Sequence, residues 1–428
     1  MKFLGRPQAP LNFLAAFIWL GLALGSNACS ADGSGLRLGG FGTLGYSGDN
    51  RPQLAAARDI SQLPKDFFRT GANVLIDSRL GLQAEYSIDP SVDLVGQVVW
   101  RDSFKARLDS STELAFVAIK PSAIVDIRVG RVSYDAFLMS DYRNVGYAYS
   151  WVRPPTEFYG WIPIFSVNGG DVAYNINTDE GTWRFKAQAG GSHLAIPVAS
   201  GAAGGYELRT NDLRGLSASW NSQAWRLKAA YSQFTVATEV GALAPLHQGL
   251  EQVMAAGIPL VSAEAADLRR NLGFKDARIT YATLGATYDD GTWMGQGELG
   301  HTTATSAVVP HGNMAYAIVG RHFGNLTAFL GLGTSRPGNP LRSAANSWGA
   351  ANASLRDPAI VNINATRMEQ DTVYLGARWD LGSRTALKLQ WQGTRIRPSG
   401  YGLWWRDIAI NEQTIHVNQL STTLDFIF

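Results

Sequence analysis

The chain has almost no cysteine and few charged residues for its length. Cys29 is the one cysteine among 428 residues, and Asp, Glu, Lys and Arg together make up 17%. A long chain without disulfides depends for its stability on a packed core or a closed sheet. Lys2 and Arg6 are the only charged residues before Asp32, and the remainder carries as many positive as negative side chains. This balance indicates no polyanionic partner, so nucleic-acid binding is not expected.

The first 31 residues have the order that is typical of a secretory signal peptide. Two positive residues precede an almost continuously apolar segment, residues 11–24, and small residues follow it. Small-x-small patterns favour cleavage after Ala28 or after Ala31. A lipoprotein signal with Cys29 as the modified residue is a less favoured alternative. We therefore expect residues 1–31 to be removed on export.

No later segment approaches the roughly 18 consecutive apolar residues of a spanning helix. The sequence instead alternates with period two, which places successive side chains on opposite faces of a strand. In 79–88 and 183–189, apolar residues alternate with charged and polar ones, and 225–232, 373–380 and 387–392 repeat the pattern. The apolar face often ends in an aromatic residue, which matches the aromatic girdles of membrane barrels.

Sixteen segments predict strands, with short turns and long loops alternating between them. The strands are 36–47, 78–88, 92–101, 112–120, 124–132, 169–176, 182–190, 213–220, 224–235, 276–288, 292–301, 313–322, 326–335, 370–380, 384–392 and 414–428. The pattern at 313–322 is too weak to define which face points inward. The long loops are 48–77, 102–111, 133–168, 191–212, 236–275, 302–312, 336–369 and 393–413. Residues 242–271 predict a surface helix within one of them.

This rhythm of short turns and long loops is how outer-membrane barrels are built. A sheet edge in lipid would leave backbone groups without hydrogen bonds, so the sheet must close. Residues 32–428 are therefore predicted to form one domain, an all-β, transmembrane, antiparallel β-barrel of about 16 strands. Sixteen strands tilted by about 40° enclose a lumen too wide for wall side chains to fill. Such a tube conducts solutes unless it is plugged.

The last strand resembles the closing strand of Gram-negative outer-membrane porins, which typically ends in phenylalanine. Leu420, Thr422, Leu424, Phe426 and Phe428 share one parity, and Phe428 is terminal. In that family the ending is read by the barrel-assembly machinery. The resemblance therefore implies that Phe426 and Phe428 act as an assembly signal.

A second resemblance to the general porins lies between residues 126 and 171. The segment 126–131 (DIRVGR) precedes a long third loop, and residues 140–160 also resemble the same loop in a porin-like subgroup of proteobacteria. In general porins this loop folds into the barrel, and its acids face arginines on the wall. The resemblance implies that the third loop, 133–168, folds inward and constricts the bore.

The candidate residues of this constriction come from the end of the strand and from the loop. They are Asp126, Arg128, Arg131, Asp141, Arg143, Arg153 and Glu157. Simple alternation gives Arg131 the parity opposite to Arg128, so either a bulge at Gly130 re-aims Arg131 or Arg128 takes the wall position. The loop arginines offset the loop acids, which argues against a strong cation preference. Loop aromatics such as Trp151 and Phe158 either pack against the wall, which we favour, or form a slide for sugars or aromatic solutes.

Other charged residues on the predicted inward faces are candidates for lining the bore. They are Glu85, Glu113, Lys186, Arg226, Arg378 and Lys388. Their arrangement, more than their number, would set ion selectivity. No cofactor is implied.

Signals for other functions are weak. Gly40-x-Gly42-x-x-Gly45 has the spacing of a dinucleotide fingerprint, but it lies in a predicted strand with no helix after it. The six histidines show no metal-ligand spacing, and no nucleophile-elbow motif indicates an enzyme. The prediction is therefore a passive porin for small hydrophilic solutes or ions, a homotrimer in outer-membrane lipid, as the resemblance implies. The alternatives are a substrate-selective channel that uses the loop aromatics, or a plugged structural or adhesin barrel.

Overall fold

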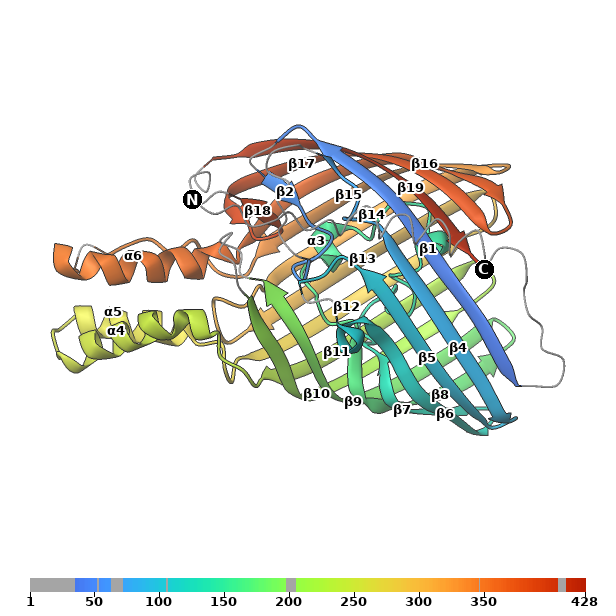
Figure 1. The fold of residues 1–428 in the computed structure, drawn as a ribbon, viewed down its shortest axis with the longest axis horizontal. Coiled ribbons are helices and arrows are strands. Elements are labelled where there is room, and N and C mark those ends of the chain that lie inside the picture. The colour runs from blue at the N-terminus through green and yellow to red at the C-terminus, as the bar shows by residue number, and fades with distance from the viewer. Residues whose placement is uncertain are drawn as a thin grey trace, which may run out of the picture.

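The computed structural model describes most of the chain after the predicted signal peptide. The described residues are 35–51, 54–62, 72–104, 107–197, 205–345, 347–406 and 413–428. Sixteen of their strands have nine or more residues and form one antiparallel sheet. The sheet closes where β1 (Leu36–Asp49) pairs with β19 (Ile415–Ile427), as Figure 1 shows. The predicted sixteen-stranded barrel is confirmed. The predicted cleavage sites lie outside the described residues.

The barrel strands follow one another around the wall in chain order. Between β1 and β19 they are β4 (Arg79–Asp89), β5 (Val92–Arg101), β6 (Thr112–Ser122), β7 (Val125–Ser133), β8 (Ser166–Thr178), β9 (Gly181–Pro197), β10 (Gly205–Asn221), β11 (Trp225–Val236), β12 (Arg278–Asp289), β13 (Trp293–Ala304), β14 (Gly312–Phe323), β15 (Leu326–Pro337), β16 (Met368–Gly382) and β17 (Thr385–Tyr401). Smaller strands are β2 (Leu54–Ala56), which pairs with β18 (Trp404–Arg406), and β3 (Ala72–Asn73), which pairs with β1. The short helices are α2 (Leu108–Ser111), η2 (Gly146–Ala148), α3 (Thr156–Tyr159) and η3 (Gly241–Leu243).

Alternation along each strand separates an apolar outer face from a polar inner face. In β17, Leu387 and Leu389 are exposed on the outside, whereas Lys388 and Gln390, which alternate with them, are 1% exposed. Outward aromatic residues gather near the short turns, where the ring centroids of Trp225 and its neighbour Tyr288 are 4.7 Å apart. In β14 the inner face is apolar as well, and this explains why its sequence pattern did not define a direction.

Several strands run further toward the long loops than the sequence predicts. β9 continues to Pro197, β10 begins at Gly205, and β17 continues to Tyr401, so the predicted loops 191–212 and 393–413 are largely strand. In β10 the register with β11 shifts after Asn211, and Asp212 has φ 52°. A bulge of this kind breaks the period-two pattern, which hides the continuation of the strand.

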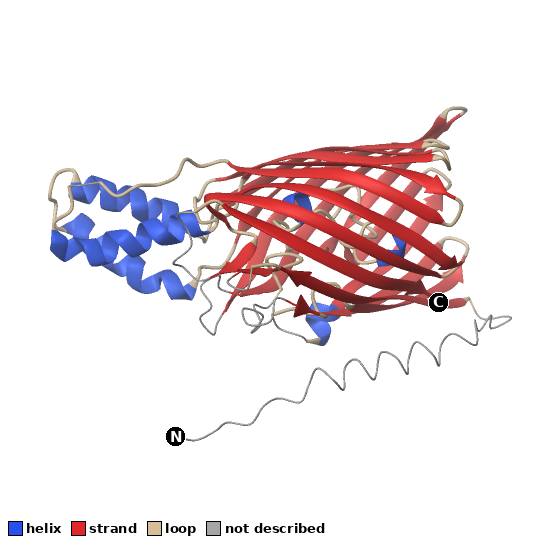
Figure 2. Ribbon diagram, turned by 90° about the horizontal axis from the view of Figure 1, so that it is seen from above, coloured by secondary structure: helices blue, strands red, loops and turns tan. Residues whose placement is uncertain are grey.

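The predicted surface helix at 242–271 is two helices, and a third was not predicted. α4 (Ala244–Ala255) and α5 (Val261–Leu272) are separated by a turn in which Gly257 and Leu260 have positive φ. α6 (Ala350–Ala365) contains Pro358 and has little amphipathic pattern, so the sequence did not indicate it. The three helices project beyond the loop end of the barrel (Figures 1 and 2). No helix in the described ranges is long and apolar enough to cross a bilayer.

Candidate functional site

The third loop, residues 134–165 between β7 and β8, lies inside the barrel. Figure 2 shows its short helical segments within the wall of strands. The loop contacts strands on different sides of the bore: the backbone N–H of Asp135 donates to Gln188 of β9 at 3.3 Å, and the backbone N–H of Val152 donates to Gln390 of β17 at 3.0 Å. The predicted inward folding of this loop is confirmed.

Arg153 holds the loop to the wall near the seam of the barrel. Its guanidinium forms an ion pair with Asp77 at 2.6 Å, and the two side chains are 2% and 1% exposed. It also donates to Ser47, Ser421 and Gln419 at 2.7–2.9 Å. An arginine with its donors fully used is well suited to a buried ion pair. Arg153 therefore serves as a tether and does not face an opening.

Two buried carboxylates hold the loop on the other side. Glu157 in α3 is fully buried and accepts hydrogen bonds from Gln370, Thr372 and Tyr374 of β16. Glu298 of β13 is also buried. It accepts hydrogen bonds from the backbone N–H of Leu138 at 2.9 Å and from the hydroxyls of Tyr159 and Tyr316. Buried carboxylates need such donors to be tolerated.

Wall cations bind the carbonyl oxygens of the loop. Lys388 donates to the carbonyls of Gly146 at 2.6 Å and Trp151 at 3.0 Å, and it pairs with Asp425 at 3.1 Å. Arg378 donates to the carbonyl of Tyr147 at 2.6 Å. Two of the predicted bore-lining cations thus fix the loop backbone.

The loop aromatics pack against one another and against the wall. Phe137 makes edge contacts with Phe158, Tyr159 and Tyr281, with ring centroids 5.8–6.2 Å apart. Phe158 is fully buried and Trp151 is 2% exposed. Rings buried to this degree support the packing interpretation over a slide for passing solutes.

One side of the bore is left uncovered by the loop. The inward-facing residues from Ala386 to Ile396 of β17 and from Val417 to Asp425 of β19 are 0–3% exposed. On the opposite wall, Gln83 and Gln97 are partly exposed, and the Arg128 side chain is 17% exposed. The remaining opening therefore runs between the loop and strands β4 to β9.

Asp141 is the loop acid that faces this opening. It is exposed, although strands surround it, and it accepts a hydrogen bond from Ser133 at 2.5 Å. Enclosure inside the barrel and the negative charge of Asp135 raise the pKa of Asp141, but the charges of Lys186 and Lys228 outweigh these effects and keep the pKa below its usual value. Asp141 is therefore a charged carboxylate at neutral pH.

Asp135, which the sequence analysis did not single out, lies beside this site. Its carboxylate pairs with Lys186 at 3.2 Å and with Lys228, and accepts from Ser217 at 2.6 Å. Burial raises the pKa of Asp135, and the two ammonium groups more than reverse that effect. A single acid just after a strand carries no distinguishing pattern, so only the fold reveals this cluster.

The charged residues of the wall are mostly paired with one another. Arg128 binds Asp171 through two nitrogens at 2.6–3.1 Å, and Asp126 pairs with Arg184 at 2.6 Å. The β7–β8 register passes through Gly130 without a shift. Arg131 therefore keeps the opposite parity and binds Ser166 and the exposed Asp109, both at 3.0 Å.

The remaining predicted residues are dispersed. Arg143 donates to the carbonyls of Ile162 and Ile164 within its own loop, and its guanidinium lies 3.2 Å from the centre of the Phe165 ring. Glu113 pairs with Arg101 at 2.8 Å and Glu85 with Arg37 at 2.6 Å. Arg226 is exposed and binds Asn221 at 2.8 Å. Asp126 and Arg128 on one face of β7, together with Asp141 of the loop, are thus the predicted constriction residues that border the opening.

The described residues contain no group of three His, Cys, Asp or Glu side chains arranged to hold a metal ion. No family model and no curated protein matches the sequence. Solved structures do match. The anion-selective porin from Comamonas acidovorans aligns over 92% of this chain and 100% of its own, with 12% identity and a TM-score of 0.52. Pseudomonas putida OprB at high pH aligns over 92% and 94%, with 8% identity and a TM-score of 0.50. This chain has the porin fold. At such low identities, the likeness establishes the fold alone.

The porin barrel closes with aromatic rings lying over glycines. Phe428 exchanges both backbone hydrogen bonds with Gly40 at 3.0 Å. A Cβ atom at Gly40 or Gly42 would lie 2.4 Å from the ring of Phe428 or 2.3 Å from that of Phe426. These glycines are therefore required by the close approach of the two rings. The apparent dinucleotide fingerprint has a structural explanation.

Proposed function

We propose that the protein is an outer-membrane porin through which small hydrophilic solutes or ions diffuse passively. The observation that carries the proposal is the strip of partly exposed polar side chains between the third loop and the wall, with Asp141 on one side and Arg128 on the other. A closed barrel with a polar, partly exposed strip along its bore offers a path through a bilayer that needs no cofactor.

Selectivity in such a path depends on how its charges are arranged. Arg128, Asp126 and Glu85 each have a partner of opposite charge within 2.6 Å. Paired charges present a weak net field to a passing ion, so the channel is expected to discriminate little between small cations and anions. We propose Asp126, Arg128 and Asp141 as residues that border the conduction path, and Arg143, Arg153 and Glu157 as residues that fix its shape.

The proposed function also implies how the protein is exported, which membrane holds it and how it assembles. Residues 1–31 would direct export, and cleavage would follow Ala28 or Ala31. The outer face of exposed leucines and aromatics suits the acyl chains of an outer membrane. Assembly as a homotrimer and recognition of Phe426 and Phe428 by the barrel-assembly machinery complete the proposal.

A plugged structural or adhesin barrel is the second candidate, because the loop covers the inner faces of β17 and β19 almost completely. In such a barrel, the projecting helices α4, α5 and α6 would be the functional part. A substrate-selective channel that uses the loop aromatics is less favoured, because those rings are buried.

Single-channel recording separates the two candidates. The refolded protein, shown to be closed by its heat-modifiable gel migration, is added to a planar bilayer in potassium chloride. Discrete ohmic steps are expected, in groups of three if the protein is a trimer. Absence of conductance from a correctly closed barrel would reject the porin proposal and favour the plugged barrel.

A further inference from the structure

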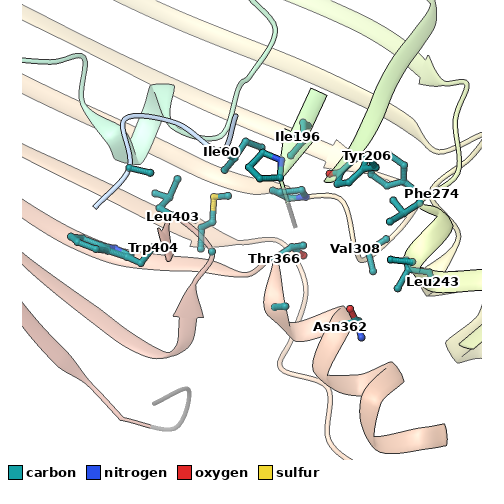
Figure 3. Close-up of a pocket in the computed structure, with 18 of the residues that line it drawn as sticks. Ile60, Ile196, Tyr206, Leu243, Phe274, Val308, Asn362, Thr366, Leu403 and Trp404 are labelled. Atoms are coloured by element: carbon teal, nitrogen blue, oxygen red, sulfur yellow. The ribbon is translucent and has the colours of Figure 1, made fainter. Parts of the chain in front are cut away.

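A cavity of about 330 Å³ lies at the loop end of the barrel, away from the opening beside Asp141. Segments of several long loops and the loop ends of β9 and β10 meet around it, as Figure 3 shows. They contribute Ile60, Ile196, Leu243, Val308, Thr366 and Leu403, among others. This volume is at the lower end of the range for small-molecule sites, about 300–1,000 Å³, and suits a molecule of one or two rings.

The lining of this cavity differs from the rest of the barrel interior. Buried ion pairs lie inside the barrel, as Arg153–Asp77 and Lys388–Asp425 do. Among the described residues that line the cavity, none is charged. Transfer of a charged molecule into such surroundings is costly, whereas apolar surface gains by leaving water. The occupant must therefore be neutral and largely apolar.

Tyr206 is the polar group best placed to orient an occupant. Its ring makes an edge contact with Phe274, with centroids 5.2 Å apart. Figure 3 shows its hydroxyl end pointing away from Phe274, toward the middle of the lining side chains. This hydroxyl has no hydrogen-bond partner among the described residues. A few polar groups in an apolar site typically fix the orientation of a ligand.

A second polar atom is less available. The side-chain amide nitrogen of Asn362 donates to the carbonyl of Pro358 at 2.8 Å, and Thr366 donates to the carbonyl of Ala307 at 3.2 Å. One free donor in an apolar cavity selects a ligand with one acceptor, such as a carbonyl oxygen.

We propose that this cavity is a binding site at the mouth of the barrel for a neutral molecule of one or two rings that carries a hydrogen-bond acceptor for Tyr206. The site is separate from the conduction path, so binding does not depend on the proposed porin function. In a conducting barrel it would hold such solutes at the entrance.

The test measures binding of coumarin and naphthalene to the full barrel by equilibrium dialysis. The protein is held in lipid nanodiscs, because free detergent would compete for an apolar cavity. The two probes have similar bicyclic size, but only coumarin has a carbonyl acceptor. Saturable binding of one coumarin per chain is expected. Tyr206→Phe should weaken coumarin binding by roughly three- to tenfold, the usual effect of one lost hydrogen bond, and leave naphthalene binding unchanged.

A blocking variant and its control complete the design. Ala242 is exposed at the rim of the cavity, so Ala242→Trp should obstruct entry and reduce binding of both probes. Ala256→Trp makes the same change at an exposed position outside the lining and should bind both as the parent does. Both variants must show the parent's heat-modifiable migration.

Three outcomes would overturn the proposal: no saturable coumarin binding, equal loss in the two tryptophan variants, or an equal effect of Tyr206→Phe on both probes. None of them bears on conductance, so failure here is distinguishable from failure of the porin proposal.

Discussion

At the scale of single residues, the loop depends on buried charges whose partners lie elsewhere in the chain. Arg153→Met leaves the carboxylate of Asp77 buried without its cation. Breaking a buried ion pair from one side typically costs about 3–5 kcal/mol. We expect a loss of stability of that order in urea unfolding from lipid vesicles, and noisier single-channel currents because the loop is released from the seam.

A matched control is available outside the barrel. Arg270→Met removes an arginine that is 73% exposed from the Arg270–Asp267 pair in α5. Exposed pairs contribute at most about 1 kcal/mol. The double variant Arg153→Met with Asp77→Asn should recover part of the stability, because no unpaired charge remains. Equal losses for the two single variants would show that Arg153 is not a tether.

Residue roles were the least predictable part of the sequence. Asp141 and Arg128 could be placed in the bore because a strand pattern and a loop length mark them. Arg153 and Glu157 were selected as loop charges facing an opening, yet both are buried against the wall. Their partners Asp77 and Gln370 lie 76 and 213 positions away. No local pattern encodes a contact that exists only after the barrel closes.

At the scale of elements, a change in the closing strand β19 can separate delivery to the outer membrane from closure of the barrel. Phe428→Ala removes a ring that stacks on Phe426 with centroids 6.3 Å apart, but the backbone bonds to Gly40 remain. We therefore expect the refolded variant to close normally, whereas its yield in outer-membrane fractions of a Gram-negative host falls several-fold. Heat-modifiable gel migration measures both the closure of the refolded variant and the yield of folded variant in the membrane fractions.

The control removes the same side chain from the same outer face. Phe323 is 54% exposed at a turn and is not terminal, so Phe323→Ala should reach the membrane at the parent's yield. Similar yields for Phe428→Ala and the parent would contradict an assembly signal at the terminus.

Elements were predictable wherever one period continued without interruption. The strand predicted at 92–101 has those bounds in the structure. The pattern failed at the irregularity beside Asp212 in β10, and it gave no sign of α6. α6 has no continuous apolar stripe along one face, so its helical periodicity is weak, in contrast to that of α4 and α5.

At the scale of the whole molecule, balanced and paired charges predict weak ion selectivity. An ideally selective channel gives a reversal potential of about 59 mV for a tenfold gradient of a monovalent salt. We expect a much smaller value in potassium chloride, because Arg128, Asp126 and Glu85 are neutralised by neighbours. A value close to the ideal limit of either sign would show that one charge dominates the path.

A change at Asp141 is expected to shift the ion selectivity of the channel. Asp141→Asn removes an exposed carboxylate from the opening and should move the reversal potential toward anion preference. Asp357→Asn, the same change on the outer helix α6, should leave it unchanged. Because the pKa of Asp141 lies below its usual value, the carboxylate is charged at neutral pH and becomes protonated only below the usual range. The potential of the parent should therefore stay constant from pH 7 to about 5. A shift toward anion preference within that interval would mean that Lys186 and Lys228 do not hold Asp141 in its charged form.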